Sequence, residues 1–77
     1  MISISQTAKN KKLHRQYSEA ELVLESTYKQ MVTLRDKVKG YGDDKIYFIM
    51  KDITDDIEFH MKTCKYNKEI IKDTIDL

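Results

Sequence analysis

Both glycines of the chain, Gly40 and Gly42, stand close together near its middle, and the sequence contains no proline. On either side run long stretches whose apolar residues recur at spacings of three and four, the period of a helix that buries one face. With no proline to break either stretch, the glycines mark the point where the chain reverses. The sequence therefore predicts an all-α fold, a two-helix antiparallel hairpin of coiled-coil type with its turn at residues 40–44.

The residues around the glycines suit a turn between two helices. The segment KVKGYGDDKIY, residues 37–47, is basic before Gly40, and cations are favourable at the carbonyl end of a helix. We expect Gly40 to adopt the left-handed conformation that ends the first helix. Gly42 then lets the chain reverse, and Asp43 or Asp44 caps the second helix.

The first helix is predicted from a heptad seam. Its apolar positions are Leu13, Tyr17, Ala20, Leu24, Met31, Leu34, Val38 and Tyr41, and only Thr27 interrupts the seam. The helix is expected to start near residue 9 or, if Ser18 and Glu21 form a capping box, at Ser18. We therefore divide the chain into a flexible basic segment, residues 1–12, and a hairpin, residues 13–77.

The second helix is predicted to run from about Lys45 to near the C-terminus. Its apolar stripe consists of Ile46, Met50, Ile53, Ile57, Met61, Cys64, Ile71 and Ile75. The repeat of this stripe lies nearer eleven residues than seven, which predicts a straight helix. Lys68 is a gap in the stripe.

A second apolar line lies outside that stripe. Phe59 and Tyr66 each follow a stripe residue by two positions, about 200° around the helix. One partner helix does not reach both lines, so we expect the hairpin to be completed by a partner chain, either a second copy or a different protein. The candidate partner-binding residues are Phe48, Phe59, Tyr66, Ile70 and Leu77 on the second helix and Leu22 on the first.

Charge is divided unevenly although the net charge is only +1. Residues 1–40 carry eight basic and four acidic residues, or +4, and residues 41–77 carry six basic and nine acidic residues, or −3. This division favours pairing of the two helices and does not suit nucleic-acid binding, which needs a broad basic face. No stretch has the roughly 20 apolar residues of a membrane span, so we expect no membrane insertion and a cytoplasmic location.

No constellation in the sequence predicts catalysis, a cofactor or a metal. Asp56, His60 and Cys64 are spaced four apart, but structural zinc takes four ligands, and His14 is expected near the far end of the hairpin. The acidic residues early in the second helix lack a pocket that would shift their pKa values, so they are interpreted as a solvated face. The single Cys64 excludes an internal disulfide and is compatible with a reducing cytosol. We expect a protein that is not an enzyme.

The pattern as a whole resembles the small co-chaperones of type III secretion needle subunits. The features that carry the likeness are a heptad first helix with a basic end, the turn from Lys39 to Lys45 with Tyr47 just after it, and a two-faced second helix. The likeness covers residues 13–77 and is one of architecture and turn chemistry. The N-terminal dozen residues have no counterpart in it.

The resemblance implies a cytoplasmic protein that pairs with a larger chaperone of helical-repeat fold. Together the two would hold a needle subunit as a soluble monomer before export. In that family the larger partner covers most of the apolar helix of the subunit, and the small one stabilises the partner. A surplus apolar helix surface, such as the one containing Phe59 and Tyr66, is what this role requires.

Three alternatives stay open from the sequence. The chain also resembles the needle subunit itself, since KEIIKDTIDL is similar to the apolar C-terminal helix of that family, but the prolines usual in its turn are absent. Small secreted hairpins of the type VII system carry a Trp-x-Gly turn, whereas this chain has Gly40-Tyr41-Gly42. An autonomous homodimeric bundle, with a regulatory role, needs no family.

Overall fold

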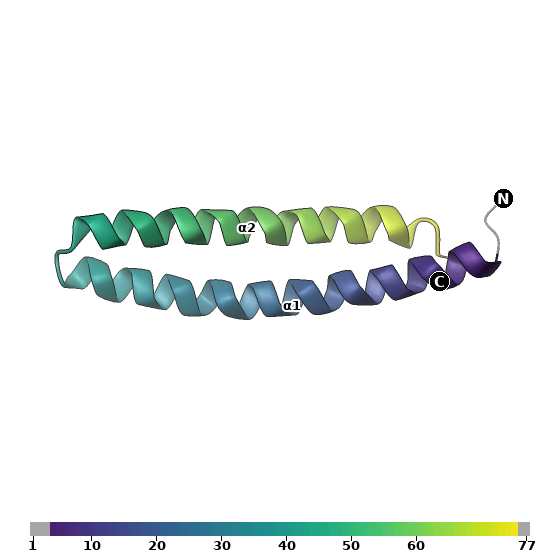
Figure 1. Ribbon diagram of the computed structural model, residues 1–77, viewed down its shortest axis with the longest axis horizontal. Coiled ribbons are helices and arrows are strands. Elements are labelled where there is room, and N and C mark those ends of the chain that lie inside the picture. The colour runs from purple at the N-terminus through teal and green to yellow at the C-terminus, as the bar shows by residue number, and fades with distance from the viewer. Residues whose placement is uncertain (1–3, 76–77) are drawn as a thin grey trace.

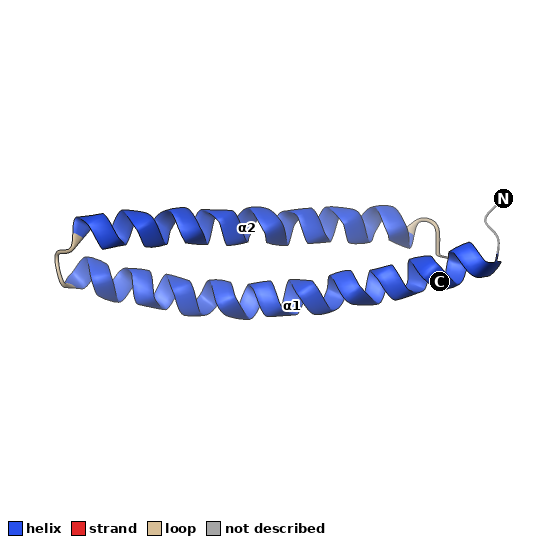
Figure 2. Cartoon of the chain, in the orientation of Figure 1, coloured by secondary structure: helices blue, strands red, loops and turns tan. Residues whose placement is uncertain are grey.

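The computed structural model describes residues 4–75, which form two long helices joined by a short turn (Figure 1). Helix α1 runs from Ile4 to Gly40 and α2 from Asp44 to Lys72. The helices lie side by side and antiparallel, with the N-terminal end of α1 extending beyond α2, and the molecule measures 58 × 15 × 15 Å. Figure 2 shows helix on both sides of the turn, and residues 4–75 contain no strand. The predicted all-α hairpin is confirmed.

The turn uses the expected residue types but exchanges the roles of its glycines. Gly42, with a φ of 78°, adopts the left-handed conformation, whereas Gly40 is the last residue of α1 and has no positive φ. The prediction for Gly40 was therefore wrong by two residues. The amide of Tyr41 still donates to the carbonyl of Val38 at 3.1 Å, so the helical winding continues past Gly40. Asp43 caps α2, because its Oδ1 accepts a hydrogen bond from the amide of Ile46 at 3.1 Å.

Helix α1 begins earlier than either predicted start. It begins at Ile4, so residues 4–12, which we assigned to a flexible segment, are helical. Ser18 is not a cap: the helix passes through it, and its hydroxyl donates to the carbonyl of His14 at 3.0 Å. A hydroxyl that bonds backward to the preceding turn is compatible with the helix interior. Residue 13 is consequently not a structural boundary.

The seam of α1 is only half of the predicted one. The predicted row of Tyr17, Leu24, Met31 and Val38 is partly covered by α2. The residues of the predicted second row are exposed. The residues one position after its first four members are partly covered instead. They are His14, Glu21, Tyr28 and Arg35, and Thr7 lies on the same line before the row begins. The helix is therefore rotated, and polar side chains enter the seam.

The seam of α2 follows seven residues and not eleven. Its covered positions are Tyr47, Met50, Thr54, Ile57, Met61, Cys64, Lys68, Ile71 and, after the helix, Ile75. Ile46 and Ile53 are exposed instead of lying in the stripe, and Thr54 and the expected gap Lys68 lie in the seam. A seven-residue repeat on both helices is the geometry of a left-handed supercoiled pair. The eleven-residue interpretation was wrong because it counted Ile46 and Ile53 as seam residues.

The hairpin has very little interior. Among the described residues only Thr54 and Ile75 are buried, with 1% and 5% of their surface exposed. The radius of gyration is 17.3 Å, whereas a compact chain of this length has a radius near 11.5 Å. Two helices alone therefore leave nearly all apolar side chains of the described residues partly exposed to water.

Candidate interaction surface

Polar contacts across the seam fix the register of the two helices. Lys68 Nζ donates to Glu21 Oε2 at 3.3 Å, and Arg35 Nη1 donates to Thr54 Oγ1 at 3.4 Å. Near the open end, Asn10 Nδ2 lies 2.7 Å from the hydroxyl of Thr74. Sliding one helix by a turn would break these contacts, so they select one alignment over the neighbouring ones.

The two sides of the hairpin differ in chemistry. Each side is defined by its position relative to the seam residues. A residue one position before a seam residue lies about 100° to one side of it, and a residue one position after lies about 100° to the other side. An antiparallel pair has a pseudo-two-fold axis perpendicular to its plane, so the same offset leads to the same side of the hairpin on both helices. Each side of the hairpin is thus built from both α1 and α2.

The side one position after the seam, which we call the charged flank, carries ion pairs. They join residues four apart on one helix, at 3.3–3.8 Å. The pairs are Glu25–Lys29, Lys51–Asp55 and Glu58–Lys62. Lys39 lies on the same side, with its Nζ 5.5 Å from the centre of the Tyr47 ring. The charged groups of these ion pairs therefore have partners within the same helix.

The side one position before the seam, which we call the apolar flank, carries aliphatic residues. They come from both helices, and all of them are exposed. The members are Leu13, Val23 and Leu34 on α1 and Ile46, Ile49, Ile53 and Ile70 on α2. Leu34, Ile46, Ile49 and Ile53 lie in the half of the hairpin nearest the turn. The same side also carries charged residues, Lys37 on α1 and Asp56 on α2.

The residues predicted to bind a partner do not gather on one side. Of the predicted set, all that fall within the described residues are exposed. Leu22 and Phe48 lie one position after seam residues, on the charged flank, and Ile70 lies on the apolar flank. Phe59 and Tyr66 lie on the outer surface of α2, two positions after Ile57 and Cys64. Leu77 lies outside the described residues.

Sequence reasoning missed the apolar flank as a continuous surface. Its α2 members Ile46 and Ile53 were assigned to the stripe that faces α1, and Leu34 was assigned to the matching seam of α1. The available signal was the width of the apolar arc, since both helices carry more aliphatic positions than one contact uses. Counting arc width on each helix would have identified the surplus.

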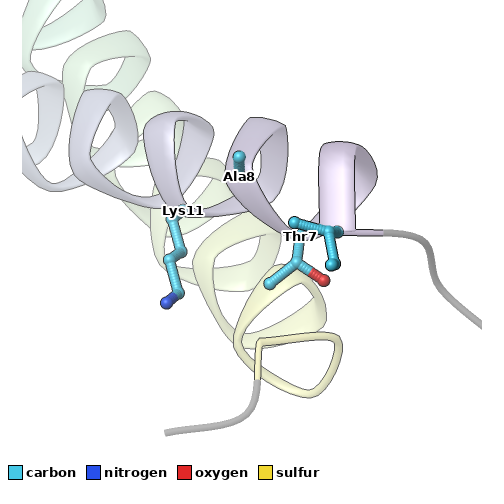
Figure 3. A pocket seen from close by; sticks show the side chains of 4 residues that line it. Thr7, Ala8 and Lys11 are labelled. Atoms are coloured by element: carbon cyan, nitrogen blue, oxygen red, sulfur yellow. The ribbon is translucent and has the colours of Figure 1, made fainter.

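The described residues form two open hollows, and no cluster of metal-ligating side chains is found among them. No group of three or more His, Cys, Asp or Glu side chains within residues 4–75 is placed to hold a metal ion. One open hollow is lined by Ile4, Thr7, Ala8 and Lys11 (Figure 3). Another lies between the helices on the charged flank, lined by Tyr28, Glu58, Met61, Lys62 and Lys65. Neither hollow brings together two carboxylates or a histidine with a nucleophile.

Neither helix, within the described part of the chain, is both long and apolar enough to span a membrane. No protein-family model matches the chain, and no curated protein or solved structure is similar to it. The candidate site is therefore defined by the hairpin's own surface, in which one flank is charged and paired and the other is aliphatic and uncovered.

Proposed function

We propose that the protein is a non-enzymatic helical interaction protein that completes its core on another helical chain. The observation that carries this proposal is the apolar flank. Its aliphatic side chains come from both helices, lie on one side of the hairpin and are exposed along its length. Exposed aliphatic residues that gather on one side of a small protein are typical of a protein-binding site.

A helical partner suits this surface better than an extended peptide or a loop. The flank is a ridge of side chains along two parallel axes, and another amphipathic helix packs into such ridges. A peptide that adds a strand would need a sheet edge, and residues 4–75 contain no strand. Helical partners also bury apolar stripes without exposing unpaired backbone groups.

The finer form of the proposal follows the resemblance to the co-chaperones of needle subunits. In this form the partner is a larger helical-repeat chaperone in the cytoplasm, and the complex keeps a type III secretion needle subunit soluble before export. Support comes from the architecture: a hairpin with a glycine-containing turn and more apolar helix surface than its own pairing uses.

Purification of the tagged full-length chain from the cells that produce it, followed by mass measurement of the intact complex, tests the proposal. The expected result is a 1:1 complex with a larger helical protein, with or without a short third chain. Glutamate at Val23 and Ile49, on the apolar flank, should abolish the complex, and glutamate at Leu22 and Phe48, on the charged flank, should leave it intact. Recovery of the chain only with itself would contradict the proposal.

A further inference from the structure

We infer that the protein on its own forms a homodimer in which the apolar flanks of two copies pack together as a four-helix bundle. This inference goes beyond the proposed function, because it assigns a second copy of this chain to the flank that a different partner would otherwise cover. Binding of a different helical chain would then compete with self-association.

The surface area of the hairpin matches this assignment. The chain exposes 6075 Å², whereas a compact monomer of 9.2 kDa exposes about 4,900 Å². The excess of roughly 1,200 Å² is somewhat more than the ~800 Å² that each partner contributes to a standard interface. One further contact of ordinary size, on one side of the hairpin, therefore brings the exposed area to the normal range.

The apolar arc of each helix has the width that a bundle needs. A helix in a four-helix bundle has two packed neighbours and carries apolar residues at about three of every seven positions, against two for a simple pair. On α2 the arc continues from the seam residues Met50 and Ile57 onto Ile46, Ile49 and Ile53. On α1 it continues from Leu24 and Val38 onto Val23 and Leu34. Both arcs widen toward the same flank.

The distribution of residues along the flank selects how the two copies align. The half nearest the turn is mostly aliphatic, with Leu34 on α1 opposite Ile53 on α2, and the charged residues of that half are Lys37 and Asp56. The other half mixes Leu13 and Ile70 with polar residues such as Gln16 and Asn67. If the turns of both copies lie at the same end, the aliphatic half of one copy packs against the aliphatic half of the other. If the turns lie at opposite ends, the aliphatic half of each copy packs against the mixed half of the other, which places aliphatic side chains against polar ones.

Charge favours the same alignment. A two-fold axis parallel to the long axis of the hairpin places α1 of one copy on α2 of the other. The charged residue of the flank on α1 near the turn is Lys37, and that on α2 is Asp56. The alignment therefore places Lys37 of one copy and Asp56 of the other on the same pair of contacting helices, and all neighbouring helices run antiparallel.

Sedimentation of the purified full-length chain over a range from about 1 to 500 µM tests the inference. The expected species has twice the chain mass of 9.2 kDa. The chain supplies matched variants, because Val23 and Leu22 are adjacent and 66% and 67% exposed, and Ile49 and Phe48 are adjacent and 59% and 60% exposed. In each pair the first residue lies on the apolar flank and the second on the charged flank.

Val23→Glu with Ile49→Glu should raise the dissociation constant of the dimer by at least about 100-fold, because it buries unpaired carboxylates in the interface. Leu22→Glu with Phe48→Glu should change it by less than about threefold, since those side chains stay in water. A chain that is monomeric at every concentration overturns the inference. So does a dimer that the two double variants weaken equally, or that only the charged-flank variant weakens.

Disulfide trapping tests the alignment without relying on a destabilised variant. Leu34→Cys and Ile53→Cys are prepared as separate chains, each with Cys64→Ala, so a disulfide between them must join two copies. Mixing them should give the mixed dimer by intact mass, whereas Phe48→Cys in the same background should give none with either chain. Mixed dimer formation with Phe48→Cys and not with Ile53→Cys overturns the inferred interface.

The outcomes separate this inference from the proposed function. A monomeric chain that captures a helical protein through its apolar flank keeps the proposed function and removes the homodimer. A homodimer through the apolar flank, with no larger protein recovered from the producing cells, keeps the homodimer and removes the proposed function.

Discussion

Glu21 and Lys68 meet across the seam, with Lys68 Nζ 3.3 Å from Glu21 Oε2, although 47 residues separate them in the sequence. Both side chains are largely covered, with 17% of Glu21 and 27% of Lys68 exposed. Each occupies a seam position where an aliphatic residue would bury more apolar surface. The pair therefore contributes less hydrophobic stabilisation than two aliphatic residues would at these positions, but it restricts the hairpin to one register.

Removal of one partner of this pair should destabilise the fold more than removal of both. We expect Lys68→Ala to lower the free energy of unfolding by about 1–2 kcal/mol, between the values for exposed and fully buried pairs. Glu21→Leu with Lys68→Leu should be at least as stable as the wild type, because the apolar pair fills the same layer. Urea denaturation measures both, and a double variant no more stable than the single one would refute the covered position of the pair.

Thr54 should be sensitive to size rather than to the loss of its hydroxyl. It is 1% exposed, and its Oγ1 donates to the carbonyl of Lys51 at 2.8 Å and accepts from Arg35. Arg35 keeps access to water, so we expect Thr54→Val to change the free energy of unfolding by less than about 1 kcal/mol. Thr54→Leu adds volume to the tightest point of the seam and should cost about 1–3 kcal/mol.

Thermal or urea unfolding of the two Thr54 variants at equal protein concentration provides the comparison. If Thr54→Leu were as stable as Thr54→Val, the helices would be loosely apposed at this layer. The concentration must be matched because a dimeric protein has a stability that depends on it.

The architecture was predictable from sequence because local chemistry determines it. The absence of proline, the position of the glycines and the acidic residue at 43 each limit where helices begin and end, and Asp43 was among the predicted caps. Within the turn, only the choice between Gly40 and Gly42 was wrong. Both glycines allow a left-handed conformation, and the distinction depends on how far the last turn of α1 continues, which the residue types do not encode.

The seam was less predictable, since an apolar pattern does not tell which partner a residue faces. Leu34 and Arg35 are neighbours about 100° apart on α1, and hydropathy favours Leu34 for the seam. The hairpin instead covers Arg35, which reaches Thr54. Apolar positions mark every surface of a helix that is suited to burial, not only the surface that faces the other helix. Assigning all of them to a single seam therefore places some residues wrongly. The same reason made Ile46 and Ile53 appear to belong to the seam.

The two glycines should respond in opposite directions to alanine. Gly42 has a positive φ, so Gly42→Ala strains the backbone and should lower the free energy of unfolding by about 1–2 kcal/mol. Gly40 lies in α1 without a positive φ, and an added Cβ would meet nothing within 4 Å. Gly40→Ala should therefore stabilise the hairpin by up to about 1 kcal/mol, since alanine favours helix over glycine.

Urea unfolding of both glycine variants gives the sign directly. Equal destabilisation by the two substitutions would mean that Gly40, too, requires a conformation closed to alanine, and the helix would then end before residue 40. Circular dichroism should show no loss of helix content in Gly40→Ala.

Substitutions on the outer surface of α2 should distinguish binding of a different protein from binding of a second copy. Phe59 and Tyr66 lie on the side of α2 that faces away from α1, and both are exposed. Neither belongs to the apolar flank. Phe59→Ala with Tyr66→Ala should therefore leave the helix content unchanged and keep the dissociation constant of the homodimer within about threefold of the wild-type value. We expect the same variant to weaken binding to a larger helical partner, which is able to reach around the hairpin.

Titration calorimetry with the captured partner and sedimentation of the free chain measure the two effects side by side. A variant that binds the partner with unchanged affinity would remove Phe59 and Tyr66 from the partner-binding surface and leave the apolar flank as the remaining candidate. A variant that loses the homodimer instead would place the self-contact on the outside of α2, because only direct burial of these rings explains a loss without a change in helix content.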